Sequence, residues 1–354
     1  MNGTLVTYLP LDVDFETARV LKSLPRARAA LAELKGTAST IPNQYILLNT
    51  LILREAKDSS EIESIITTHD ELYKSQLRLF GFNSSAAKEV ENYVKAMNSG
   101  FDFLKKTGII TIGHIKKIQS TLENNEAGFR KLPGTQLKND TTGEIIYTPP
   151  QHPEEIAALM SNLVDYINRD SDVDPLIRMA VIHHQFESIH PFYDGNGRTG
   201  RILNILFLVH QGLLNIPILY LSSYITRNKT DYYRLLQEVR IDGKWEDWIL
   251  YMIEGIRKTA LDSIDLVSDI KELMMRFKHE IRDNYKFYSQ DLINNLFAHP
   301  YTKIDFLQRD LQVTRLTATS YLNQLVEGGY LEKLKYGRSN YYVNHQLFQM
   351  LSRP

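Results

Sequence analysis

The sequence predicts a mainly α-helical protein that has one small β-hairpin in its middle and a helix-turn-helix unit with a second hairpin at its C-terminal end. Apolar residues recur every three or four positions over most of the chain, which is typical of helices packed against a core. Residues 128–150 instead combine prolines and glycines with a short β-prone run. The chain has 354 residues, of which 43% are apolar and 23% charged, so it is large enough for two to three folded domains.

The first hundred residues are expected to contain three helices. Apolar side chains between Thr17 and Leu34 form one stripe at helical spacing, and Gly36 is expected to end that helix. A second helix starts near Asn43 and continues into the sequence EAKDSSEIES, and a third covers roughly residues 86–104. We therefore expect an N-terminal helical region over residues 1–100.

The middle of the chain, residues 101–268, is expected to form a second helical domain that includes the small hairpin. The β-prone run of the hairpin is Ile145-Ile146-Tyr147, and helical periodicity resumes at Pro153. The most apolar window, residues 202–221, reaches transmembrane length, but polar residues such as Asn204 interrupt it and are costly in hydrocarbon. We expect a buried core helix there and no interaction with a membrane.

The C-terminal segment, residues 276–354, has the order of elements found in winged-helix domains. A short helix at 306–311 is followed by the sequence VTRLTATSYLNQLVEGGYL, which reads as a turn and a longer helix, and two strands then flank the turn at 335–339. The segment contains 11 Lys or Arg and 7 Asp or Glu, a net charge of +4. Arg315 on the second helix and Lys335 and Arg338 in the wing are candidate DNA contacts.

Net charge and cysteine content exclude several classes of function. The whole chain carries a net charge of −1, so global charge gives no argument for binding nucleic acid or a membrane surface. Cysteine is absent, which excludes disulfides, thiolate metal sites and a cysteine nucleophile. The N-terminal residues lack the basic start and apolar stretch of a signal peptide, and together with the absence of cysteine this favours a cytoplasmic location.

One stretch of twelve residues, HPFYDGNGRTGR from His190 to Arg201, concentrates residue types that handle phosphate groups. Gly195 and Gly197 allow a tight turn whose amides can face an anion, and a helix that begins near Asn196 adds its free N–H groups and positive dipole end. Arg198 and Arg201 lie three residues apart, so they share a helix face and can clamp phosphates together.

Two further side chains in this stretch supply chemistry. Asp194 is a single carboxylate beside the phosphate cradle, which suits Mg²⁺ because this ion takes few protein ligands and completes its shell with phosphate and water. His190 titrates near neutrality and can remove a proton from an attacking hydroxyl. Any one of these features is common by itself, but their concentration in twelve residues favours a nucleotide site over a structural turn.

The stretch resembles the signature of the Fic family, HPFx(D/E)GNGRxxR, and matches it at every specified position. The resemblance covers most of residues 1 to about 260 and implies a Fic-type helical fold and transfer of AMP from ATP to a Ser, Thr or Tyr hydroxyl of a target protein. It implies that His190 is the base, that Asp194 binds Mg²⁺, and that Asn196 and the loop amides hold the inner phosphates while Arg198 and Arg201 bind the outer ones.

The resemblance extends to segments outside the motif. The hairpin strand with Ile145, Ile146 and Tyr147 resembles the family's flap, which holds a target segment by strand addition. Tyr232 and Tyr233 follow the motif where family resemblance suggests an adenine contact, although packing in the core is the alternative for such an aromatic pair.

An inhibitory element is also expected from the resemblance. Family members often carry a helix with the pattern (S/T)xxxE(G/N), whose glutamate pairs with the second arginine of the motif. Ser59 and Glu63 fit this pattern, whereas Ser64 replaces the expected glycine or asparagine. A carboxylate on Arg201 would remove the guanidinium that positions the γ-phosphate. The alternative is that Ser60 and Glu63 form an ordinary helix capping box.

Two functions from different classes follow from these patterns. The first is a protein adenylyltransferase with ATP and Mg²⁺ as substrate and cofactor, inhibited by its own Glu63. The second is a nucleic-acid-binding regulator in which the Fic domain is a nucleotide sensor, and a transferase that moves a different phosphate-containing group is a further alternative. The expected partner is a target protein, and DNA and a second copy of the chain stay open as partners.

Overall fold

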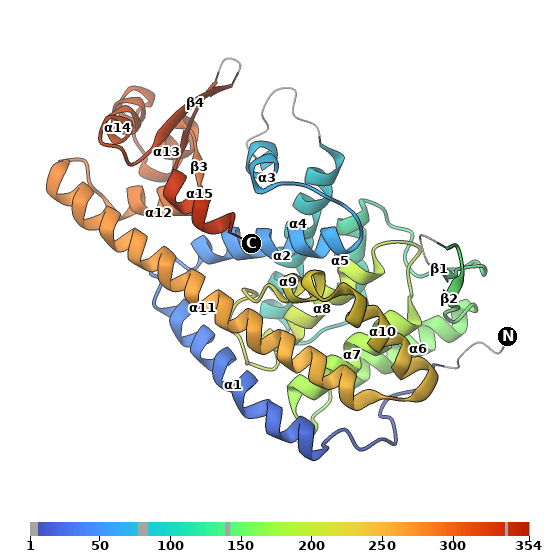
Figure 1. Cartoon of the computed structure of the whole chain (residues 1–354). Helices are drawn as coiled ribbons and strands as arrows, with labels where there is room; N and C mark the ends of the chain where they lie inside the picture. The colour runs from blue at the N-terminus through green and yellow to red at the C-terminus, as the bar shows by residue number, and fades with distance from the viewer. Residues whose placement is uncertain (1–5, 77–83, 139–141, 337–338, 354) are drawn as a thin grey trace.

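A computed structural model describes residues 6–76, 84–138, 142–336 and 339–353 (Figure 1). Most of them are helical, as the sequence predicted. The helices are α1 (Ala18–Ser39), α2 (Tyr45–Ile62), α3 (His69–Gln76), α4 (Ser85–Thr107), α5 (Ile112–Glu123), α6 (Pro153–Asn168), α7 (Pro175–Ile189), α8 (Asn196–His210), α9 (Leu221–Arg227), α10 (Lys229–Asp242), α11 (Trp245–Asn284), α12 (Gln290–Ala298), α13 (Ile304–Leu311), α14 (Arg315–Glu327) and α15 (His345–Leu351). The strands are β1 (Leu137–Lys138), β2 (Ile145–Tyr147), β3 (Tyr301–Thr302), β4 (Glu332–Tyr336) and β5 (Ser339–Val343).

The helices α7 and α8 form the centre of the larger part of the molecule. Every residue of α7 from Leu176 to Ile189 is buried, as expected of a helix that has other elements on all sides. It packs on α6, α8 and α11, and α8 packs in turn on α4 and α5. The loop between the two helices, residues 190–195, is therefore held at both ends by the core. Phe192 anchors it, since its fully buried ring packs against those of Phe129 and Phe186.

The long helices α1 and α11 lie side by side along one edge of the molecule (Figure 1). The expectation that the first helix ends at Gly36 is wrong, because α1 continues to Ser39 and is capped at Thr40. Gly36 does not adopt a positive φ, so the helical backbone passes through it. Helices also pass through the expected domain limits, because α4 continues beyond residue 100 and α11 runs through residues 268 and 276.

The small hairpin of β1 and β2 is antiparallel and lies at one end of the molecule, close to α10 (Figure 1). Of its three β-prone residues, one is buried and two are exposed to solvent. The hydroxyl of Tyr147 donates a 2.8 Å hydrogen bond to the Ser188 carbonyl oxygen, whereas the side chains of Ile145 and Ile146 are exposed. The exposed pair is the part of the hairpin that is available to another chain.

The C-terminal segment contains α13 and α14 followed by the hairpin β4–β5, in the order that the sequence predicted. Gly328 caps α14, as its double glycine suggested. The elements α12, α15 and β3 were not expected. Strand β3 has only two residues, too few to produce an alternating pattern, and it completes a three-stranded sheet in the order β3-β5-β4.

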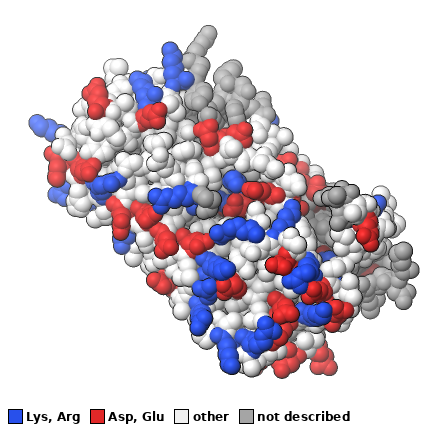
Figure 2. Space-filling model, in the orientation of Figure 1, with Lys and Arg blue, Asp and Glu red and all other residues white. Residues whose placement is uncertain are grey.

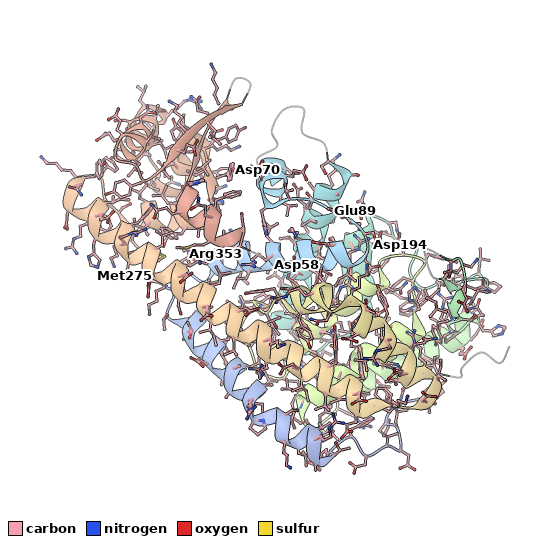
Figure 3. All side chains as sticks on the ribbon, in the orientation of Figure 1. Asp58, Asp70, Glu89, Asp194, Met275 and Arg353 are labelled. Carbon is pink, nitrogen blue, oxygen red and sulfur yellow. The ribbon has the colours of Figure 1, made fainter. Side chains whose placement is uncertain are left out.

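This C-terminal unit packs directly against α2 and α3. Helix α12 lies against α2, and the Arg54 Nη2 of α2 donates a 2.9 Å hydrogen bond to the carbonyl oxygen of Arg353, which Figure 3 shows beside α2. The Tyr301 hydroxyl donates to Asp70 of α3 over 2.7 Å. Among the described residues, no helix has the length and apolar character needed to cross a membrane.

Candidate active site

His190 is the residue at which α7 ends. Its backbone is in the left-handed region, with φ 47°, and its N–H donates to the Phe186 carbonyl as the last bond of the helix. Burial above all, together with the positive charges of Arg130 and Arg240, lowers the pKa of the imidazole to about 3, and the Glu63 carboxylate has a smaller effect in the opposite direction. The ring is therefore neutral at pH 7, and its Nδ1 has no hydrogen-bond partner among the described residues. A neutral imidazole can accept a proton.

Two glycines of the loop after His190 lie directly against carboxylates. Gly195 adopts φ 76° at the start of α8, and a Cβ atom there would collide with the Glu123 carboxylate. A Cβ atom on Gly197 would collide with the Glu63 carboxylate. The carboxylates of Glu123 and Glu63 therefore lie over the first turn of α8, where free N–H groups attract anions.

Asn196 fixes the loop rather than facing outward. Its Oδ1 accepts a 2.9 Å hydrogen bond from the Phe192 N–H, and its Nδ2 donates over 2.9 Å to the Phe192 carbonyl oxygen. The side chain is 3% exposed. The expected contribution of Asn196 to phosphate binding can thus come from its backbone N–H, while its side chain holds the turn closed.

Arg201 is buried, and its Nε and Nη2 contact the end of α2. Its Nε donates to the Ser59 hydroxyl over 2.8 Å, and its Nη2 donates both to the Ser59 carbonyl and to the Glu63 Oε1, over 2.9 and 2.7 Å. Burial is the largest single effect and raises the pKa of Glu63, but the charge and hydrogen bond of Arg201, together with the charge of Arg198, outweigh it, so this pKa is lowered and the carboxylate is ionised. The two residues expected from the inhibitory pattern therefore meet the second arginine of the motif.

Ser64 occupies a left-handed position directly after α2, with φ 64°. The Ser64 N–H bonds to the Glu61 carbonyl and the Ile65 N–H bonds to the Ser60 carbonyl, both over 3.0 Å, which is the Schellman arrangement of a helix end. Glycine and asparagine tolerate this conformation best, which explains in physical terms why the expected pattern has one of them here. Serine adopts it at a cost in stability.

Replacing Ser64 with glycine is expected to raise the free energy of unfolding by about 1 kcal/mol, because glycine adopts the left-handed conformation without steric cost. The measurement is equilibrium denaturation of wild type and variant. Asn124→Gly is the matched control, since Asn124 also caps a helix in the left-handed region, with φ 50°, and asparagine already tolerates it. Equal gains from the two substitutions would show that Ser64 carries no particular strain.

Arg198 is held by two carboxylates that sequence reasoning missed. Its Nη1 donates to Glu89 of α4 over 3.0 Å and its Nη2 to Glu123 of α5 over 2.8 Å. Burial raises the pKa of Glu123 against the effect of Arg198, and the charges of Asp194 and Glu89 act in the same direction as burial. Glu89 and Asp194 lie on the same side of the molecule in Figure 3.

Asp194 lies at the exposed surface of the loop. Its Oδ1 accepts a 2.7 Å hydrogen bond from the Gly195 N–H, and its carbonyl oxygen accepts one from the Gln119 Nε2 over 3.2 Å. An exposed carboxylate whose backbone is held at the rim of an anion cradle fits Mg²⁺, which binds one or two carboxylates together with phosphates and water. Within the described ranges, no group of three or more His, Cys, Asp or Glu side chains forms a protein-only metal cage.

The two tyrosines expected near adenine have different environments. Tyr232 is 1% exposed, and its hydroxyl shares a 2.8 Å hydrogen bond with the His183 Nε2 beside the Trp248 ring. It is a core residue, which is the alternative that the sequence left open. Tyr233 is 47% exposed and packs edge-on against Tyr232, so it is the member of the pair that a ligand can reach.

Three family models match the chain in succession. Residues 21–102 match the Fic/DOC family N-terminal region, residues 109–208 match the Fic/DOC family, and residues 273–347 match the protein adenylyltransferase SoFic-like C-terminal domain. The first two matches contain the site residues from Ser59 to Arg201, whereas Tyr232 and Tyr233 lie outside them, and the third contains the C-terminal elements from α12 to β5 with the start of α15.

Curated relatives carry related names. A probable protein adenylyltransferase of Aquifex aeolicus is 28% identical over 251 residues, which are 64% of this chain and 74% of that protein. The protein adenylyltransferase fic-1 of Caenorhabditis elegans is 32% identical over 123 residues, or 32% of this chain. This chain covers only 24% of the C. elegans protein and 39% of a Drosophila willistoni protein adenylyltransferase Fic that is 26% identical to it.

Solved structures share the fold. A Fic family protein from Desulfovibrio desulfuricans superposes with a TM-score of 0.59 over 95% of this chain and 97% of its own, at 18% identity. Residues 134–508 of C. elegans Fic-1 give a TM-score of 0.52 over 71% of this chain and 73% of that structure, at 20% identity. The mainly helical fold predicted from the sequence is confirmed by these neighbours.

Proposed function

The chain belongs to the Fic/DOC family, and on this premise we propose that it is a protein adenylyltransferase that moves AMP from ATP to a Ser, Thr or Tyr hydroxyl of a target protein. The observation that carries the proposal is the neutral imidazole of His190 at the end of α7, next to a glycine loop and a helix N-terminus that suit a triphosphate. The names of the curated relatives support AMP as the group transferred.

The chemistry that these residues support is a direct displacement. The target hydroxyl oxygen attacks the α-phosphorus of ATP, its proton passes to His190, and the bond to the β-phosphate breaks so that pyrophosphate leaves with the electron pair. The loop amides and Arg198 and Arg201 hold the phosphates in line, so most of the rate comes from positioning and charge stabilisation. Asp194 would hold Mg²⁺, which neutralises phosphate charge when bound.

The hairpin is the proposed dock for the target segment. Ile145 and Ile146 present apolar side chains to solvent, while Tyr147 ties the strand to the core and the Gln237 Nε2 holds the Ile146 carbonyl over 2.5 Å. A strand tied to the core by these two contacts is a fixed element to which an extended target segment can add.

The resting state is proposed to be inhibited by Glu63. Its ion pair with Arg201 occupies the guanidinium that the outer phosphate needs, and the Ser59 hydroxyl and carbonyl take two further donors of the same side chain. ATP must compete with these contacts, and any ATP that binds beside them has its α-phosphate out of line.

Incubation with ATP labelled at either the α- or the γ-phosphate tests the proposed function. Because wild type is expected to be inhibited, the assay includes Glu63→Gly. Label from α-ATP alone on protein is the expected result. Label from γ-ATP would identify phosphoryl transfer, and the absence of both labels in the folded variant would favour the nucleotide-sensor alternative.

The C-terminal unit is retained as a candidate DNA-binding module. Leu316 and Ser320 of α14 are exposed, but Arg315 forms a 3.0 Å ion pair with Asp305, which offsets its charge, and Arg338 lies outside the described residues. On the face shown in Figure 2, positive and negative side chains are interspersed. If the unit binds DNA, its affinity falls steeply with salt and weakens in Arg315→Ala. A mobility-shift assay with genomic fragments at two salt concentrations measures both, and no binding at low salt favours a protein-docking role.

A further inference from the structure

Arg130, in the loop between α5 and β1, makes an unusual set of contacts for an arginine. It is 1% exposed, and within the described ranges its guanidinium donates to backbone carbonyl oxygens alone, while its Nη1 has no partner there. Its Nε donates to His190 over 2.7 Å, and its Nη2 donates to Pro150 over 2.8 Å and to Ile189 over 3.4 Å. The Arg130 N–H also donates to the Pro191 carbonyl over 2.8 Å. Among the described residues, no carboxylate forms an ion pair with it.

These contacts join the two parts of the site that must meet in the reaction. Ile189, His190 and Pro191 are the residues at which α7 turns into the motif loop, and Pro150 lies just after the flap strand β2. The last carbonyls of a helix have no partner inside the helix and carry partial negative charge, which a buried guanidinium satisfies. The left-handed conformation of His190 is unfavourable for a residue other than glycine, and it persists only where its surroundings hold it.

We propose that Arg130 is a positioning residue that fixes the backbone of His190 and the base of the flap to each other, and so sets the direction in which the imidazole meets the target hydroxyl. This inference rests on the proposed function. The charge of Arg130 also disfavours protonation of the His190 imidazole. The charged groups that act on the His190 ring are Arg130, Arg240 and Glu63, and the two arginines oppose protonation of the ring while Glu63 favours it.

Two substitutions separate these two effects. Arg130→Lys keeps the positive charge but loses the fork that spans three carbonyls, whereas Arg130→Met loses both. In a Glu63→Gly background, kcat for AMP transfer is expected to fall about 10²-fold in each variant, the typical cost of misplacing a reacting group by about 1 Å, with KM for ATP little changed. The acid limb of the kcat–pH profile moves to higher pH in Arg130→Met only, because removal of the charge lets the pKa of His190 rise toward its usual value.

Arg178 provides a matched control. It is 2% exposed, and its Nη2 bonds to the Tyr166, Ile167 and Arg169 carbonyl oxygens at the end of α6, so it has the same chemistry away from His190. Arg178→Lys is expected to lower stability without changing the pH profile or the kcat of the folded protein. If Arg130→Lys and Arg178→Lys behave alike in kcat and in denaturation, Arg130 has a structural role only and the proposal is overturned.

The pKa of the His190 ring can also be measured without any assay of AMP transfer. The ring signals of His190, assigned by comparison with His190→Asn, are followed by NMR as the pH is lowered. In Arg130→Met the ring is expected to titrate at higher pH than in wild type or Arg130→Lys. The same titration in all three would contradict the electrostatic part of the proposal, and this result does not depend on whether the protein transfers AMP.

Discussion

AMP incorporation should fall by about 10²–10⁴-fold when His190 is replaced by alanine in the Glu63→Gly background, since this is the usual cost of losing a general base. ATP binding should change little, because the imidazole acts on the incoming hydroxyl and the phosphates are held by the loop and α8. The measurements are incorporation of α-labelled AMP and calorimetric ATP affinity. The unperturbed rate in a folded His190→Ala protein would remove the imidazole from the mechanism.

The left-handed backbone of His190 calls for a second variant. Alanine is strained at φ 47°, whereas asparagine tolerates this region, so His190→Asn removes the base with less disturbance of the loop. Both variants are expected to be equally inactive if the base alone matters. An active His190→Asn beside an inactive His190→Ala would assign the loss to the backbone instead.

Replacing Glu63 with glycine is expected to raise AMP incorporation about 100-fold. The carboxylate lies 2.7 Å from Nη2 of Arg201, and its removal frees this guanidinium to draw the γ-phosphate into place, which brings the α-phosphate into line. Self-modification on hydroxyl residues is expected as well. The measurement is α-labelled AMP incorporation by wild type and variant at equal protein concentration.

Two controls make this prediction specific. The double variant Glu63→Gly, Arg201→Ala should lose the gain, because the freed arginine produces it. Glu61→Gly introduces a glycine into the same helix end, where Glu61 pairs with Lys57 over 2.9 Å and not with Arg201, so it should activate far less. Activation by Glu61→Gly equal to that by Glu63→Gly would point to general loosening of α2, and no activation by either would leave Glu63 as a capping residue.

The sequence predicted those parts of the site that lie close together in the chain. The span from His190 to Arg201 contains the proposed base, the turn and the start of α8, and the helix begins at Asn196, where the local pattern placed it. The pairing of Ser59 and Glu63 with Arg201 bridges about 140 residues, and only resemblance to a family pattern connected the two segments. The expected helix end at Gly36 is wrong because the chain does not turn there: Gly36 has no positive φ, and α1 continues to Ser39.

Other site residues had no local signal. Glu89, Glu123 and Arg130 belong to segments whose charged residues look like an ordinary solvated surface, and only the packing of α4 and α5 on α8 brings two of them to Arg198. Asn196 was assigned to phosphate from its place in the motif, yet both side-chain atoms close the turn at Phe192. Residue type and spacing give the composition of a site, but hydrogen-bond partners depend on the tertiary fold.

Helix α2 contacts both the motif at Arg201 and the C-terminal unit. Its C-terminal end holds Ser59 and Glu63 against Arg201, while Arg54, about two turns away, bonds to the chain end at Arg353 and α12 lies against the same helix. Helix α2 has 18 residues. At a rise of 1.5 Å per residue, Arg54 and Glu63 are about 14 Å apart along its axis, so a rigid shift of the helix moves both sets of contacts together. Thermodynamic linkage makes any coupling between the two sites reciprocal. If a ligand of the C-terminal unit changes the affinity for ATP by some factor, ATP changes the affinity for that ligand by the same factor.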